Sequence, residues 1–189
     1  MLKFFKKNSY EISRFLVMQV GITIFAFVLT MAMKTIKSSA VLWVSIFSVC
    51  FYLFLVYSVA WEIGGKDKIR IDAGRQARTP LRGLFAMLYA QIPNLVLSAL
   101  MMVGGLIFLL SASPVGARIY GIGYFIAVLF DAMYFGIVDA IAIGFGKTYF
   151  AIGLIYLLST LPALLTAWIG YYLGSIGRGI ARLNSPTKK

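Results

Sequence analysis

The amino-acid sequence predicts an all-α integral membrane protein, a single bundle of hydrophobic helices with little chain outside the bilayer. Composition is the first reason, because 61% of the 189 residues are hydrophobic and only 13% are charged. A soluble domain is about half apolar and a quarter charged. Patterning is the second reason, because the apolar residues gather into five long segments at 15–33, 40–61, 84–110, 119–145 and 149–173. We therefore expect one membrane domain that covers residues 1–189.

Each segment is long enough to cross a bilayer, since a helix needs roughly 20 apolar residues to span about 30 Å of hydrocarbon. Four segments hold no charged residue, and the segment 119–145 holds Asp131 and Asp139. The first segment follows a lysine-rich tail, as a secretory signal does, but its apolar run is longer than the roughly 7–15 residues of such a signal. We expect it to be kept as a helix of the bundle.

The basic residues lie between the apolar segments, a distribution typical of membrane loops and not of a nucleic-acid-binding domain. Lys and Arg number eighteen, against six Asp and Glu. Because cytoplasmic loops are rich in Lys and Arg, we place the N-terminus and the loop 62–83 in the cytoplasm. The chain is then a multi-pass protein of the cell (inner) membrane. The lipid bilayer is its expected partner, and nucleic acid is not.

Two layouts of the chain stay open. Five plain spans put the two tails on opposite sides of the membrane, and an uninterrupted apolar run such as 119–145 is usually a plain helix. If 119–145 is instead a re-entrant hairpin that turns at Asp131, both tails and the loop 62–83 share one face. That face then holds fourteen of the eighteen basic residues, which agrees better with the positive-inside rule.

The polar residues within the apolar segments are candidates for an intramembrane site. An ionised carboxylate at membrane depth costs at least about 2.5–3.5 kcal/mol, so such groups face the bundle interior or a partner. Asp131 and Asp139 are about 80° apart around one helix and about 12 Å apart along it. With Gln91 and Asn94, which flank Pro93, they predict a cation or proton path, or a site for a cationic solute. The structural alternative is two carboxyl groups hydrogen-bonded to neighbouring Tyr or Gln side chains.

Small residues recur at every fourth position, a spacing that lets another helix approach closely. The positions expected to form helix-packing contacts are Ala132, Gly136, Ala140, Gly144, Gly170 and Gly174. These contacts would serve the interior of the bundle or a dimer.

The loop 62–83 mixes charges of both signs, a pattern that favours a folded loop with internal ion pairs. We expect it to dock a cytoplasmic partner or lipid headgroups, or to act only as a positive-inside anchor. The candidate docking residues are Glu62, Lys66, Asp67, Lys68, Arg70 and Arg75.

The sequence contains no set of residues typical of a catalytic site. The chain has no histidine, and its single cysteine, Cys50, lies in an apolar segment. The commonest metal ligand and the commonest general base are therefore missing. We expect no enzyme activity, no cofactor and no metal site.

Several short motifs resemble those of a group of uncharacterised small bacterial multi-span membrane proteins. They are W-E-x-G-x-K-D at 61–67, Q-I-P-N at 91–94, A-M-Y-x-G at 132–136 and Y-Y-x-G at 171–174. The resemblance implies a bacterial inner-membrane setting, and it brings no activity with it.

These features favour two classes of function, and a third class, a lipid-modifying enzyme, fits them least. The first is transport of a small solute or an ion, either by this chain or by a complex of which it is the membrane subunit. The alternative is a non-catalytic membrane partner, or scaffold, that docks a complex through the loop 62–83.

A cysteine placed at Ser185 tests the two layouts. The hairpin layout predicts labelling by an impermeant maleimide only from the cytoplasmic side of the membrane. Labelling of this residue from the outside would remove the hairpin layout.

Overall fold

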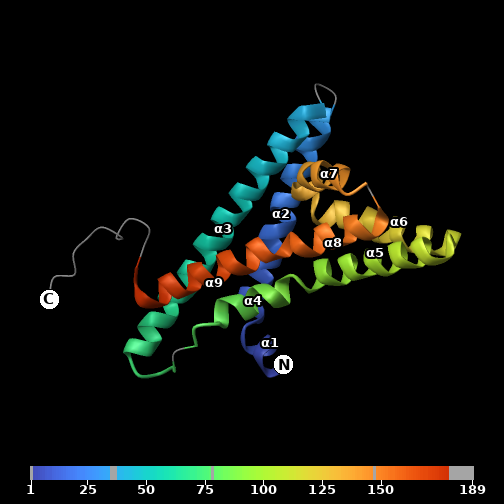
Figure 1. The fold of residues 1–189 in the computed structure, drawn as a ribbon. Helices are drawn as coiled ribbons and strands as arrows, with labels where there is room; N and C mark the ends of the chain where they lie inside the picture. Colours follow the sequence, from blue (N-terminus) through green and yellow to red (C-terminus); the bar gives the residue numbers. More distant parts are fainter. Residues whose placement is uncertain (1, 35–37, 78, 147, 179–189) are drawn as a thin grey trace.

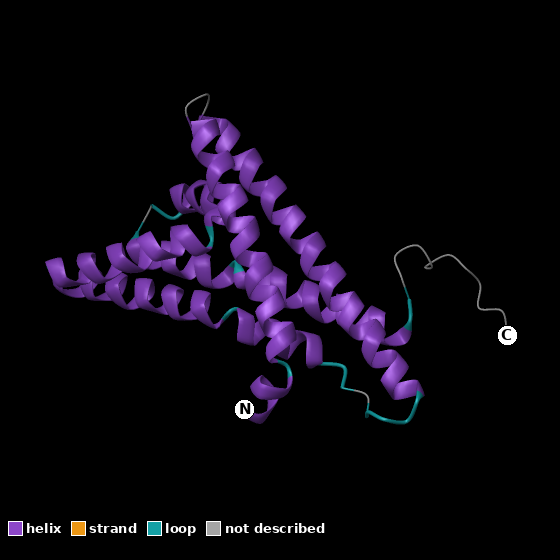
Figure 2. Cartoon of the chain, turned by 180° about the vertical axis from the view of Figure 1, so that it is seen from behind, coloured by secondary structure: helices purple, strands orange, loops and turns teal. Residues whose placement is uncertain are grey.

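The computed structural model describes residues 2–34, 38–77, 79–146 and 148–178, and in these residues it contains helices and connections but no strand (Figures 1 and 2). The prediction of an all-α bundle is confirmed. The helices, with η1 a 3₁₀-helix, are α1 (Leu2–Lys7), α2 (Ser9–Lys34), α3 (Ser38–Asp72), α4 (Arg82–Ala90), α5 (Ile92–Ser111), α6 (Pro114–Phe130), η1 (Ala132–Tyr134), α7 (Phe135–Gly144), α8 (Tyr149–Leu158) and α9 (Thr160–Ile176).

The helices form an open, roughly triangular bundle. In Figure 1, α2 and α3 meet at the top and separate downward, while α5, α6 and α8 extend together to the right. The most extensive helix contact joins α3 to α9, and α5 packs against both α6 and α8. The helices α7 and α9 thus pack along α3, while α6 and α8 pack mainly against α5.

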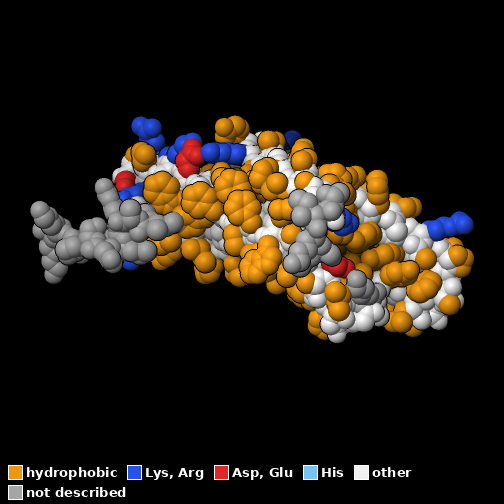
Figure 3. All heavy atoms as spheres, turned by 90° about the horizontal axis from the view of Figure 1, so that it is seen from above, with side chains coloured by type: hydrophobic (Ala, Val, Ile, Leu, Met, Phe, Trp, Pro, Cys, Tyr) orange, Lys and Arg blue, Asp and Glu red, His pale blue; other side chains and the backbone are white. Residues whose placement is uncertain are grey.

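Four helical stretches are long and apolar enough to cross a membrane: Ser9–Lys34, Ala40–Asp72, Ile92–Ser111 and Tyr149–Ile176. Large apolar side chains on them point outward, and Val17 and Leu110 are 72% and 78% exposed. Figure 3 shows a face that is largely hydrophobic, with charged side chains gathered mainly toward one end. Such a surface suits lipid and not water, so the described helices are consistent with a multi-span membrane protein.

The fourth apolar segment is not the single helix expected for a plain span. The helix pair α6 and η1–α7 is bent by 93°. Asp131 closes α6 by donating its N–H to Ala127 O at 2.7 Å, and its own carbonyl accepts from Tyr134 N at 2.9 Å. This tight turn of 3₁₀ type replaces the next α-helical turn, so the expectation of an uninterrupted helix over 119–145 was wrong.

Both ends of this bent segment lie at the C-terminal end of α5. Gly116, near the start of α6, packs against the Phe108 backbone. The Tyr149 ring, at the start of α8, lies 5.0 Å from the Phe108 ring between centroids. The chain thus enters and leaves the segment at one end of α5, a geometry that favours the hairpin layout. The C-terminal residues 179–189, whose charges contribute to that layout, lie outside the described residues.

The predicted loop 62–83 is largely helical. The helix α3 continues to Asp72, and only the stretch from 73 to 81 connects it to α4. Charged side chains support the extension, because Lys66 pairs with Glu62 at 2.7 Å and Arg70 lies 3.6 Å from Asp67. These pairs have the i,i+4 and i,i+3 spacings that stabilise a helix. The expected internal ion pairs are present, although they lie on a helix and not in a loop.

The glycines of α9 act as predicted for close helix packing. A Cβ at Gly170 would meet the Tyr57 backbone, and one at Gly174 would clash with the Trp61 carbonyl oxygen, both on α3. Gly136 on α7 lies in the same way against Val41 of α3.

The rest of the predicted stripe differs from the prediction. Ala132 is buried, but Ala140 and Gly144 are exposed, and a Cβ at Gly144 would meet nothing. Gly136, Ala140 and Gly144 all lie in α7, and the residues of α7 that face inward are Gly136, Val138 and Ala142. Residues four apart on a helix of about 3.6 residues per turn drift by about 40° at each step, so Gly144 lies about 80° around α7 from Gly136.

Replacing Gly174 by Ala should lower the free energy of unfolding in detergent by about 1–3 kcal/mol, because the added methyl group overpacks the α3–α9 contact. Gly21→Ala on α2 is the matched control, since a Cβ there meets nothing. It should leave stability unchanged or raise it by about 0.5–1 kcal/mol. Thermal unfolding followed by circular dichroism compares the two, and equal midpoints would contradict this contact.

Candidate functional site

Three of the apolar segments are interrupted, each at a polar residue. Gln91 separates α4 from α5, Asp131 separates α6 from η1, and Ser159 separates α8 from α9. A break frees backbone groups that hydrocarbon cannot satisfy, so other parts of the protein must bind them. Side chains do so here: Thr23 Oγ1 on α2 donates to Phe130 O at 2.8 Å, and Ser159 Oγ donates to Tyr156 O at 2.7 Å.

Two of these breaks meet in a chain of buried hydrogen bonds, which we call the Asp131 cluster: Gln19, Tyr52, Gln91, Asn94 and Asp131. The Asp131 Oδ1 atom accepts from Gln19 Nε2 at 3.1 Å and from Asn94 Nδ2 at 3.0 Å. Asn94 Nδ2 also donates to Gln91 Oε1 at 2.6 Å, and Gln91 Nε2 donates to Tyr52 OH at 3.1 Å. The cluster therefore joins α2, α3, α5 and the break after α6.

The Asp131 carboxylate is surrounded by neutral groups. Its side chain is buried, with 3% of the residue exposed, and no described Lys or Arg forms an ion pair with it. Its donors are amides, and Asn94 stands in the first turn of α5, where the helix macrodipole favours negative charge. A carboxylate in such surroundings lacks a counter-charge that a cation or a proton would supply.

Unused acceptor atoms lie in the same part of the bundle. Gln19 Oε1, on the amide that bonds Asp131, is buried and has no hydrogen-bond partner among the described residues. The buried hydroxyl groups of Tyr134 and Tyr156 also lack partners there. Buried polar atoms without partners are costly. These oxygens are available to a cation or to a hydrogen-bond donor.

The structure separates the two aspartates that the sequence analysis paired. Gln91, Asn94 and Asp131 come together as expected, but Asp139 is exposed on α7 and lies outside the Asp131 cluster. The break at 131–134 is the reason, because it turns α7 away from the axis of α6. Gln19 was missed, since one neutral polar residue in an apolar run gives little sign of its partner.

A second buried polar group, the Arg82 cluster, occupies the charged end of the bundle: Asn8, Glu11, Asp67, Arg82 and Tyr171. Arg82 Nη1 donates to both Asp67 oxygens at 2.6 and 2.5 Å, and Nη2 donates to Glu11 at 3.0 Å. Arg82 Nε donates to Asn8 Oδ1 at 2.9 Å, and Tyr171 OH donates to Asp67 Oδ2 at 2.8 Å. The cluster ties the starts of α2 and α4 to α3 and α9.

The Arg82 cluster changes the interpretation of the charged segment 62–83. Asp67 is buried, so it is not a surface docking residue. Glu62 pairs with Arg14 of α2 at 2.6 Å. The acidic residues that favoured docking thus serve contacts within the fold. Of the predicted docking residues, Lys66, Arg70 and Arg75 are exposed, and Glu62 and Lys68 are half-buried.

Arg82 itself was counted in the sequence only as one more basic loop residue. The faint signal for its role lies at the start of α2, where Asn8, just before the helix, and Glu11 stand three positions apart and can share a helix face. Neither cluster has the composition of a resident metal centre. No group of three or more His, Cys, Asp or Glu that could hold a metal ion occurs in the part of the chain that the structure describes.

Comparison with protein-family models, with curated proteins and with solved structures found no match for this chain. The fold and the two clusters define the class: an all-helical protein with several membrane-spanning candidates and interrupted helices. The resemblance of its short motifs to small bacterial membrane proteins stays a prediction, so any argument about function rests on the geometry.

Arg82→Gln should destabilise the protein by about 3–5 kcal/mol, because it leaves the buried Asp67 carboxylate without its main partner. The matched control is Arg70→Gln, whose side chain is 57% exposed and 3.6 Å from the same carboxylate. Loss of this exposed side chain should lower the free energy of unfolding by about 0–1 kcal/mol. Thermal unfolding in mild detergent measures both variants, and a tolerated Arg82→Gln would show that the cluster does not hold the four helices together.

Proposed function

We propose that this chain carries a small cation or a small cationic solute across the membrane, alone or as the membrane subunit of a transporter. Asp131 would be the carboxylate that binds it. The observation that carries the proposal is a buried carboxylate that has no basic partner among the described residues, placed where two interrupted helices meet. An ionisable residue inside membrane-spanning segments is by default a candidate for an ion or substrate path.

Interrupted helices support the same proposal. In many secondary transporters the substrate or coupling ion binds near mid-membrane, at discontinuous helices whose ends and freed carbonyl groups contact it. Here the first turn of α5 and the last residue of α6 both border Asp131. The unused oxygen of Gln19 adds a neutral acceptor beside the carboxylate. Oxygen acceptors around one negative charge favour a cation over an anion.

The proposal also includes the membrane in which the protein lies and its orientation there. We propose a bacterial inner membrane, with the N-terminus and the end of α3 in the cytoplasm. The contacts of α9 support placing its C-terminal end on the same side, since Trp61 Nε1 donates to Arg178 O at 2.9 Å. The basic residues of the N-terminal tail, of 62–83 and of the α9 end then share one face, as the positive-inside rule requires.

The alternative, a non-catalytic partner protein, makes a different prediction about the same chain. If the charged end docks another subunit, replacing the exposed Lys66, Arg70 and Arg75 should release a protein that co-purifies in mild detergent. The buried Asp67 is unsuitable for this comparison, because changing it would disturb the Arg82 cluster.

The isosteric change Asp131→Asn should reduce cation flux at least about tenfold, because it removes the only charge of the cluster and keeps its shape. Asp139→Asn is the matched control, since Asp139 is exposed on α7 and should be replaceable without loss of flux. Proteoliposomes report uptake of protons with an enclosed pH-sensitive dye, and of radioactive sodium or tetraphenylphosphonium directly.

Wild-type protein must first move at least one of these three probes faster than empty liposomes. Equal flux from wild type and a folded Asp131→Asn variant would contradict the proposal. So would an equal loss in Asp139→Asn, since it would show that the effect does not depend on the buried site.

A further inference from the structure

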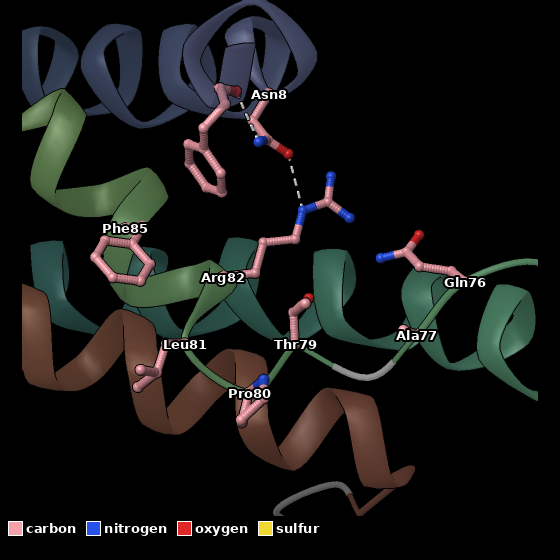
Figure 4. Close-up of a pocket in the computed structure, with 9 residues that line it drawn as sticks. Asn8, Gln76, Ala77, Thr79, Pro80, Leu81, Arg82 and Phe85 are labelled. Atoms are coloured by element: carbon pink, nitrogen blue, oxygen red, sulfur yellow. Dashed lines mark hydrogen bonds between the residues drawn. The ribbon is translucent and has the colours of Figure 1, made fainter. Parts of the chain in front are cut away.

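A cavity of about 570 Å³ opens at the charged end of the molecule, between the residues before α2, the connection 73–81 and the start of α4. Its polar lining comes from Asn8, Gln76, Thr79 and Arg82 (Figure 4). Figure 4 shows Gln76 and Arg82 pointing toward one another across the cavity. Arg82 is held in place by the carboxylates behind it, and no acidic side chain is among the described residues that line the cavity.

The cavity adjoins an apolar groove of about 500 Å³, because Phe4 and Phe85 line both. From there the groove follows Leu88, Ile92 and Leu95 along α4 and α5. From Phe85 to Leu95 the helical rise is about 15 Å, which is half of the roughly 30 Å hydrocarbon thickness of a bilayer. The groove therefore runs from a polar end at the charged face into the depth of one leaflet.

We infer that this groove binds one phospholipid with an anionic headgroup, with the headgroup at Gln76 and the neighbouring Arg75 and an acyl chain along α4 and α5. Charge supports this occupant. Lys6 and Arg75 stand close in the sequence to the lining residues Asn8 and Gln76 and are exposed and basic, and such residues attract anionic headgroups. Among the described residues the Gln76 side chain forms no hydrogen bond, so its amide is available to a phosphate oxygen.

A second copy of this chain fits the groove less well. An identical subunit would bring more positive charge to an end that is already basic. A lipid satisfies both parts of the groove at once, because its phosphate matches the polar end and its chain matches the apolar wall. The site is distinct from the Asp131 cluster, so it does not depend on the proposed transport.

Native mass spectrometry of the full chain in mild detergent tests the site, with dioleoyl phosphatidylglycerol and dioleoyl phosphatidylcholine added in equal amounts. Wild type should retain one phosphatidylglycerol at least about tenfold in preference to phosphatidylcholine. The double variant Lys6→Gln/Arg75→Gln should lose this preference. The matched control Lys66→Gln/Arg70→Gln removes two exposed basic residues of the same end and should keep it.

A substitution in the apolar wall distinguishes binding in the groove from general attraction of anionic lipid to basic residues. Leu88→Trp should reduce retention of phosphatidylglycerol at least about fivefold by filling the wall, whereas Leu161→Trp, on the outer surface of α9, should not. Equal retention of the two lipids by wild type would overturn the inference. An equal loss in the Lys66/Arg70 variant, or no loss in a folded Leu88→Trp variant, would overturn it as well.

Discussion

A carboxylate removed from water needs hydrogen-bond donors, and Asp131 finds its donors on two other helices. Gln19 reaches it from α2 and Asn94 from the first turn of α5. Both bonds require the backbone near Asp131 to lie close to those helices. The break after Phe130 and the turn through η1 bring the carboxylate to its donors. The bend of 93° between α6 and η1–α7 therefore lies at the residue whose side chain joins α2 and α5.

The charged end of the bundle also buries an ionised group, but there the group has counter-charges within the fold. Arg82 is buried, and its charge is balanced by Asp67 and Glu11 within the fold. That cluster fixes where α4 begins, and α4 leads directly to the break at Gln91 that places Asn94 beside Asp131. The two buried clusters are therefore linked through the short helix α4. The Arg82 cluster holds the starts of the helices together, and the Asp131 cluster contains one carboxylate that has no counter-charge among the described residues.

Much of the fold could be predicted from the sequence because hydropathy alone decides which segments leave water. The grouping of Gln91, Asn94 and Asp131 could also be expected, since polar groups in apolar segments must satisfy one another. The error at Asp139 came from assuming one unbroken helix, whose phase the turn at η1 changes. Gln19 and Arg82 could not be placed, because their partners are 112 and 15 residues away along the chain, and helix packing alone brings them together.

The fourth segment turns at Asp131, and we propose that it returns to the side of the membrane from which it enters. Single cysteines at Ser111 and Thr148, in a Cys50→Ser background, test it most directly, because these residues stand on either side of that segment. Labelling of oriented membrane vesicles with an impermeant maleimide should modify both cysteines from the same side, opposite to a cysteine at Arg75. Modification of Ser111→Cys and Thr148→Cys from opposite sides would contradict the account.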